Sequence, residues 1–265
     1  MRFTIIFFFG MLIAGQASAQ FWFGPKFGMQ FSKNAYQDKD YSKDYDIAES
    51  LTWHAGFAMQ YTTETKFAVH TELIYLQLKN KITNLPADPE LLSESTHSII
   101  SAPLLGRYTL FYNGSFSTYI MAGPRLSYWI GGSGNLFSQE GFDADGLEGG
   151  PYDVGFSPSP GGIGDGILSV SKPNRLQYGL DIGIGSVMDL ASGQRVSFEL
   201  RYSKGHSHMA LGQEKLLEGA SYTENYRYAN NQLLASIGFL FGYNPADKRK
   251  GSSTNKLSNK NKKTK

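Results

Sequence analysis

The sequence contains no cysteine, which excludes a disulfide framework, a thiolate zinc site and a cysteine nucleophile. A large excess of one charge is also lacking. The 25 Lys and Arg residues face 23 Asp and Glu residues, so no basic field indicates nucleic acid as a partner. The only long apolar run covers residues 3–14, and a helix needs about 20 apolar residues to span a bilayer. With a mean hydropathy of −0.31, a polytopic helical membrane protein is excluded.

The first 19 residues have the pattern of a secretory signal peptide. Arg2 supplies a positive start, residues 3–14 form the apolar stretch, and Ala17-Ser18-Ala19 is a small-x-small cleavage site. We therefore expect residues 1–19 to be removed and the exported chain to start at Gln20. The alternative is an uncleaved membrane anchor, for which the apolar stretch is short.

The sequence is rich in aromatic residues, at 14%, and in glycine, with 30 residues. Eight segments carry apolar residues at every second position, and a period of two predicts β-strands because successive side chains point to opposite faces. The segments cover residues 21–31, 51–62, 66–79, 100–110, 116–130, 176–188, 196–203 and 232–243. In the third segment, the alternation breaks at Ile74, Leu76 and Leu78.

The two faces of these segments differ in a way that favours a membrane barrel. The apolar face is continuous and ends in aromatic residues, as lipid contact requires, whereas the other face carries Gly, Ser, Thr, Gln and a few charges. A soluble sandwich would have a face rich in Lys and Glu, and a soluble lipocalin-like barrel would have its apolar side chains inside. Because hydrocarbon offers no hydrogen-bond partner to a sheet edge, the sheet must close.

The connections between the segments alternate in length. Short ones at 63–65, 112–115 and 191–194 include Asn113-Gly114 and Ser192-Gly193, whereas long ones cover roughly 32–50, 80–97, 131–173 and 205–229. Short periplasmic turns and long extracellular loops are typical of outer-membrane barrels. We predict an all-β fold: an eight-stranded antiparallel up-and-down transmembrane β-barrel over residues 20–246, in contact with outer-membrane lipid. An even strand number places both termini in the periplasm.

Aromatic residues near the predicted strand ends resemble two interfacial girdles. The periplasmic set is Tyr61, Phe67, Tyr108, Phe111, Tyr112, Phe116, Phe239, Phe241 and Tyr243, and the outer set is Trp53, Tyr128 and Trp129.

The inward-facing positions include charges of both signs. The predicted lumen charge network consists of Lys26, Arg107, Arg125 and Arg201 with Glu72, Asp181 and Glu199, and His54 and His70 lie nearby. Unpaired buried charges are costly, and eight strands leave an interior that side chains nearly fill. We interpret these residues as a structural ion-pair plug rather than a conducting pore.

Several segments resemble a known family. They are FGPKFGMQFS (residues 23–32), WHAGFAMQY (53–61), FAVHTELIYLQ (67–77), APLLGRY (102–108), MAGPRLSY (121–128) and LDIGIGSVMDL followed by FELRYSKG. Together they resemble the PorT-like outer-membrane β-barrel family of Gram-negative bacteria, over nearly all of residues 21–243. The resemblance implies location and architecture. Some members serve a protein-secretion and gliding machinery, and the family supplies no catalytic motif. The glycine-rich third loop and the tail beyond the last strand depart from its pattern.

Three motifs carry part of the pattern of a chemical site. His206-Ser207-His208, with Glu199 or Glu214, has the residue types of a nucleophilic hydrolase, but neighbours on a strand point opposite ways. Asp143-Ala144-Asp145-Gly146 carries part of a calcium-loop pattern without the distal Glu. Gly161-Gly162-Ile163-Gly164 lacks the strand-to-helix context of a nucleotide loop. We therefore predict neither catalytic residues nor a cofactor. A weakly bound divalent ion in the acidic third loop stays an alternative.

The C-terminal tail differs from the barrel in charge. Residues 247–265 carry a net charge of +7, whereas residues 20–246 carry 16 basic and 22 acidic residues. Such a tail is expected to be disordered in the periplasm and to attract anionic surfaces, although a solvated tail without a partner is equally compatible with the sequence.

We predict a non-enzymatic structural or interaction protein of the cell envelope, with partners met through Tyr36, Tyr41, Tyr45, the third loop or the tail. The alternatives are a secretion accessory, a narrow channel and a lipid-modifying enzyme.

Overall fold

The computed structural model describes residues 20–48, 50–63, 65–84, 91–136, 151–157, 163–164, 167–211 and 225–243. The predicted signal peptide at 1–19 and the predicted tail at 247–265 lie outside these ranges. The described chain consists almost entirely of strands, and its single helix is one turn long, too short to cross a membrane.

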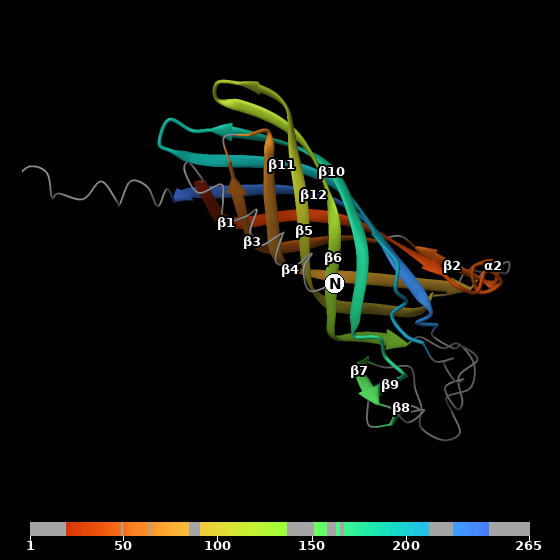
Figure 1. Cartoon of the computed structure of the whole chain (residues 1–265). Coiled ribbons are helices and arrows are strands. Elements are labelled where there is room, and N and C mark those ends of the chain that lie inside the picture. Colours follow the sequence, from red (N-terminus) through yellow and green to blue (C-terminus); the bar gives the residue numbers. More distant parts are fainter. Residues whose placement is uncertain are drawn as a thin grey trace, which may run out of the picture.

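Eight strands close into a ring in which every neighbouring pair is antiparallel. In ring order they are β1 (Gln20–Tyr36), β3 (Ser50–Thr62), β4 (Phe67–Asn84), β5 (Leu91–Asn113), β6 (Phe116–Leu136), β10 (Leu176–Asp189), β11 (Gln194–Gly205) and β12 (Tyr228–Tyr243). Pairing of β12 with β1, for example Ile237 with Phe27, closes the ring. The predicted eight-stranded antiparallel barrel is confirmed, and Figure 1 shows its tilted strands side by side.

Three tight connections lie at one end of the barrel, which we call the short-turn end. They join β3 to β4, β5 to β6 and β10 to β11. Gly114 (φ +59°) and Gly193 (φ +84°) adopt left-handed backbone conformations in two of them. Glycine suits these positions because it has no Cβ to clash there. The opposite end, with the long connections, is the long-loop end.

The long connections contain more structure than the sequence predicted. The first holds α2 (Tyr41–Asp44) and β2 (Tyr45–Ala48), and β2 pairs with the far part of β4. The third holds β7 (Pro151–Ser157), β8 (Ile163–Gly164) and β9 (Ile167–Ser171). In Figure 1, β2 and α2 lie at the right, and β7, β8 and β9 lie below the barrel wall.

Several strands also run past the predicted boundaries, which is a second correction. β4 continues to Asn84, β5 already begins at Leu91, and β6 continues to Leu136. The second and third long loops are therefore shorter than predicted, because these strands extend beyond the apolar belt described next.

The outer wall of the barrel carries a belt of exposed apolar side chains. Leu180, Ile182 and Ile184 on β10 are each about half to two-thirds exposed, and all eight strands contribute to the belt. Aromatic side chains at the short-turn end, including Phe67, Phe111 and Tyr112, are exposed as the girdle prediction requires. In a soluble protein, such a surface would drive aggregation, whereas in a bilayer it contacts hydrocarbon.

Toward the long-loop end, the apolar side chains of the strands change from the outer face to the inner face. On β4, the outer side chains change from Leu73 to Gln77 and Lys79, while Leu76 and Leu78 point inward and are fully buried. They belong to an apolar cluster inside the long-loop end: Leu76, Leu78, Ile99, Trp129, Tyr152, Val154, Leu168, Val170, Met209, Ala210, Tyr226 and Tyr228. Trp129, which the sequence assigned to the outer girdle, has no exposed surface, so that assignment is wrong.

Candidate functional site

The middle of the lumen contains the charged residues singled out from the sequence. Each side chain points inward and is between 1% and 6% exposed. They come from six strands: Lys26 (β1), Glu72 (β4), Arg107 (β5), Arg125 (β6), Asp181 (β10), and Glu199 and Arg201 (β11). They face inward because each lies at the opposite parity to the apolar belt on its own strand.

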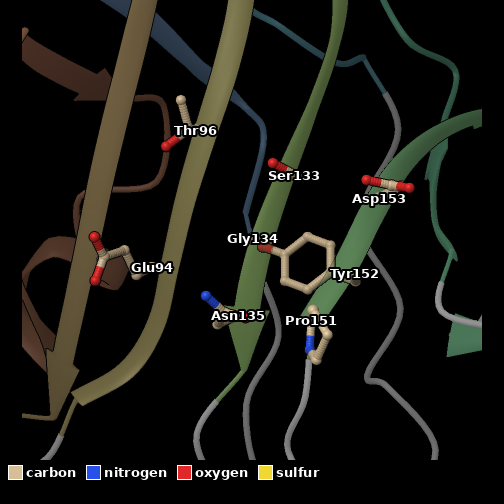
Figure 2. Close-up of a pocket in the computed structure, with 8 residues that line it drawn as sticks. All are labelled: Glu94, Thr96, Ser133, Gly134, Asn135, Pro151, Tyr152 and Asp153. Carbon is tan, nitrogen blue, oxygen red and sulfur yellow. The ribbon is translucent and has the colours of Figure 1, made fainter.

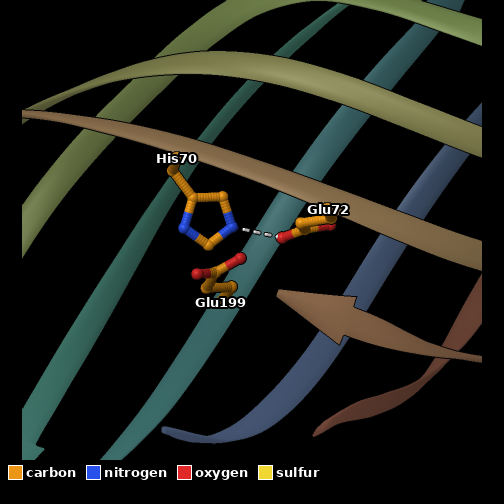
Figure 3. Close-up of side chains that lie close together, drawn as sticks. All are labelled: His70, Glu72 and Glu199. Atoms are coloured by element: carbon orange, nitrogen blue, oxygen red, sulfur yellow. Dashed lines mark hydrogen bonds and ion pairs between the residues drawn. The ribbon is translucent and has the colours of Figure 1, made fainter. Parts of the chain in front are cut away.

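Lys26 lies at the centre of this network. Its Nζ atom donates to Glu72 Oε1 and to Glu199 Oε2, and so it joins the carboxylates of two strands. The Glu72 carboxylate is also hydrogen-bonded to His70 Nε2, at 2.5 Å, and to Arg201 Nη2, at 3.0 Å. Figure 3 shows the His70 ring turned toward Glu72, with Glu199 beside them. Buried carboxylates are stable only when several cations and hydrogen-bond donors surround them in this way.

A second group of ion pairs extends the network toward the long-loop end. Arg201 Nε lies 3.4 Å from Asp181 Oδ2, and Arg125 Nε lies 3.5 Å from Asp181 Oδ1. The hydroxyl of Ser203 donates to the same Asp181 carboxylate. The structure therefore links Lys26, Glu72, Glu199, Arg201, Asp181 and Arg125 in one chain of ion pairs.

Arg107 does not take part in these ion pairs. Its guanidinium lies over the ring of Tyr119, with Cζ 3.3 Å from the ring centroid. The Tyr119 hydroxyl donates to Glu199 Oε1 at 2.6 Å. Arg107 is thus connected to the network through an aromatic ring rather than through a carboxylate.

A line of amides that sequence reasoning missed continues from Arg125 toward the long-loop end. Each group donates to the next: Arg125 to Gln232 at 3.2 Å, Gln232 to Asn230 at 2.6 Å, Asn230 to Asn34 at 2.9 Å, Asn34 to Asn80 at 2.7 Å and Asn80 to the Tyr228 hydroxyl at 3.0 Å. Their common direction allows the bonds to polarise one another. The sequence signal that could have indicated this line is the set of amide residues at inward-facing positions of β1 and β12.

His70, Glu72 and Glu199 could in principle hold a metal ion, because one ligand atom from each lies within 4.8 Å of the others. One histidine and two carboxylates form a ligand set typical of divalent transition metals. The ammonium group of Lys26, however, contacts both carboxylates. A fixed cation of the chain itself therefore stands where a metal ion would be bound.

Among the hydrolase candidates that the structure describes, no hydrogen bond joins Ser207 to His206 or His208. His206 is exposed, and its ring lies 5.3 Å from that of Tyr178, on the outer wall. Ser207 is buried, and its Oγ accepts from the backbone N–H of Tyr178 at 2.7 Å. Glu199 is bonded to Lys26 and Tyr119. Glu214 lies outside the described residues.

An open polar pocket lies at the long-loop end between β5, β6 and β7 (Figure 2). It is lined by Glu94, Thr96, Ser133, Gly134, Asn135, Pro151, Tyr152 and Asp153. Lys79 donates to Glu94, and this hydrogen bond lowers the pKa of the Glu94 carboxyl. Of the acidic third loop, Asp153 lies here, whereas the partial calcium pattern at 143–146 lies outside the described residues.

A family model described as outer membrane protein beta-barrel domain matches residues 14–209. A comparison with curated proteins found no match. Among solved structures, the outer membrane protein OprG of Pseudomonas aeruginosa is similar at 12% identity, with 85% of this chain and 95% of OprG covered and a TM-score of 0.43.

Two further solved structures are similar to a comparable degree. Ail, the attachment invasion locus protein of Yersinia pestis, has 11% identity, coverages of 83% of this chain and 98% of Ail, and a TM-score of 0.35. The outer membrane protease OmpT of Escherichia coli has 11% identity, coverages of 86% and 97%, and a TM-score of 0.40. Likenesses at this level carry no argument about activity.

Proposed function

Because the chain belongs to the outer membrane protein beta-barrel domain family, and so to the bacterial outer membrane, we propose that it is a closed, non-enzymatic barrel that acts as a structural and interaction component of the cell envelope. The observation that carries this proposal is the burial of the lumen network. A water-filled pore would leave Lys26, Glu72 and Glu199 exposed, yet their side chains are at most 2% exposed. The apolar cluster at the long-loop end adds a second closure.

The proposal includes an orientation in the membrane. The short-turn end and both termini face the periplasm, after removal of residues 1–19. The long-loop end faces outward and offers a contact surface around Tyr36, Tyr41 and Tyr45. The rings of Tyr36 and Tyr41 lie 5.0 Å apart, and those of Tyr41 and Tyr45 lie 4.8 Å apart. Clustered aromatic side chains in loops favour contact with proteins or glycans.

The orientation can be tested directly because the chain has no native cysteine. Asp38→Cys, at the long-loop end, is expected to react with a membrane-impermeant maleimide on intact cells. Ser192→Cys, at the short-turn end, is expected to react only after the outer membrane is permeabilised. Both positions are exposed, so the reverse labelling pattern would refute the orientation.

Closure is tested by conductance. Wild-type protein in planar lipid bilayers is expected to give no ion-conducting steps. Lys26→Ala should open the network and admit ions, whereas Lys43→Ala, which removes an exposed ion pair with Asp40, should leave the barrel closed. Heat-dependent gel migration shows whether each variant is folded. Conducting steps from the wild type would overturn the closed-barrel proposal.

Two finer assignments complete the proposal. The quoted motifs favour the PorT-like subfamily, and an accessory role in a secretion or gliding machinery, which some members of that family have, is the alternative function. Photo-crosslinking from Tyr41 in intact cells, with an identical crosslinker at Ser115 of the short-turn end, tests whether envelope proteins meet the long-loop surface.

The non-enzymatic assignment predicts that purified protein leaves phospholipid and lipid A unchanged. If a lipid product did form and His206→Ala or Ser207→Ala abolished it, the assignment would fail.

A further inference from the structure

Arg107 is a buried cation whose donors are not all used. The residue is 5% exposed, and its Nε and Nη1 atoms have no hydrogen-bond partner in the described chain. A buried guanidinium with free N–H groups is costly, so such a group in a folded protein calls for a bound water or ion.

The carboxylates of the lumen are already committed elsewhere. Glu72 is hydrogen-bonded to Lys26, His70 and Arg201, and Glu199 to Lys26 and Tyr119. Asp181 forms ion pairs with Arg125 and Arg201. Four lumen cations thus face three lumen carboxylates, and Arg107 is the cation left over. The network is one negative charge short of balance at this position.

The surroundings of Arg107 favour an anion. Its register partner on β4 is Ala68, a small and partly exposed residue that is the second of the strand, at the short-turn end. A second guanidinium of the short-turn end, that of Arg195 on β11, is paired with Asp189 and lies over the ring of Trp22, whose buried Nε1–H has no partner in the described chain.

We propose that Arg107 binds a small oxyanion of the phosphate class, which enters through the short-turn end of the barrel. A guanidinium matches the geometry of such oxyanions, and Tyr119 holds its plane in place by stacking. The weak screening inside the barrel strengthens the attraction. This site goes beyond the proposed function, since a closed barrel does not require an anion.

The test is isothermal titration of inorganic phosphate into the full-length protein in detergent micelles, at constant ionic strength. Wild-type protein is expected to bind phosphate at one saturable site. Arg107→Met should weaken binding by about tenfold or more, because it removes charge-assisted hydrogen bonds. Arg175→Met is the matched control: Arg175 also stacks on aromatic rings, those of Tyr128 and Phe156, but at the long-loop end. This control should bind like the wild type.

A second measurement keeps the test decisive if Arg107→Met fails to fold. In NMR spectra of the wild type, phosphate should shift the indole N–H of Trp22, while that of Trp53, on the outer wall, should stay in place. Absence of saturable binding to the wild type, or unchanged binding by folded Arg107→Met, overturns the proposal. Bilayer conductance by the wild type would instead refute the closed barrel, so the two failures are distinguishable.

Discussion

At the scale of single residues, Lys26 contributes most directly to the stability of the lumen. We expect Lys26→Met to lower the free energy of unfolding by about 3–5 kcal/mol, because it leaves Glu72 and Glu199 facing each other without their shared cation. Denaturant unfolding in lipid vesicles measures the change. Lys43→Met is the control: it removes an ion pair with Asp40 that is exposed to water, and little change is expected. Equal effects of the two substitutions would contradict the central role of Lys26.

The burial of His97 predicts that the stability of the barrel depends on pH. Its outward-facing neighbours Glu94, Thr96 and Ser98 are polar, so this part of β5 lies beyond the apolar belt. Burial between Trp129 and Tyr226 lowers the pKa of His97 to about 3. Between that value and the ordinary one near 6.5, the unfolded chain binds a proton that the folded chain does not. Stability contributed by neutral His97 is therefore lost as the pH falls below about 6.5.

Comparison with His97→Phe isolates this effect, because phenylalanine keeps an aromatic ring but does not titrate. Between pH 7 and pH 5, the wild type should lose roughly 2 kcal/mol more unfolding free energy than the variant does. Parallel pH profiles for the two proteins would show that His97 is protonated in the folded barrel or is exposed to water.

At the scale of strands and turns, Gly114 tests the hairpin between β5 and β6. A Cβ at Gly114 would meet no atom within 4 Å, and the same is true of Gly131, but of these two glycines only Gly114 has a positive φ. Gly114→Ala should therefore cost about 1–2 kcal/mol of unfolding free energy through backbone strain, whereas Gly131→Ala should be nearly neutral. Refolding yields in vesicles provide an independent reading. A neutral Gly114→Ala would mean that the turn adopts another conformation.

The strands also show what the sequence could and could not predict. Alternation predicted the ring strands because lipid outside and a tight lumen inside impose opposite chemistry on neighbouring residues. Beyond the apolar belt, water lies outside and an apolar cluster lies inside, so the pattern shifts by one residue. Ile74, Leu76 and Leu78 therefore looked like a break in the pattern when they in fact continue β4. The same shift explains why Trp129 was placed outside.

Side-chain partners were beyond the reach of the sequence for a different reason. Parity along a strand indicates which charges face inward, but the partner of Lys26 depends on the stagger of strands around the ring. Glu72 and Glu199 lie 46 and 173 residues away from Lys26 in the chain. For the same reason, parity could not reveal that Arg107 stacks on Tyr119 rather than meeting a carboxylate.

At the scale of the whole molecule, the barrel combines an apolar outer surface with a charged interior. Its belt contacts hydrocarbon, and its lumen keeps seven charged side chains away from water. The two parts stabilise each other. The closed ring satisfies the backbone groups that lipid cannot, and the ion pairs hold inward-facing charges from five of the eight strands together.

The position of the belt can be tested with a single charge at two heights. Ile182→Arg, in the middle of the belt on β10, should cost about 2–4 kcal/mol of folding free energy in vesicles, because the guanidinium would lie near the bilayer midplane. Thr96→Arg, on the outer face of β5 beyond the belt, should cost little because its guanidinium stays in water. Both proteins can be unfolded by denaturant in the same vesicles. Similar costs at both positions would mean that the apolar belt does not mark the height of the bilayer.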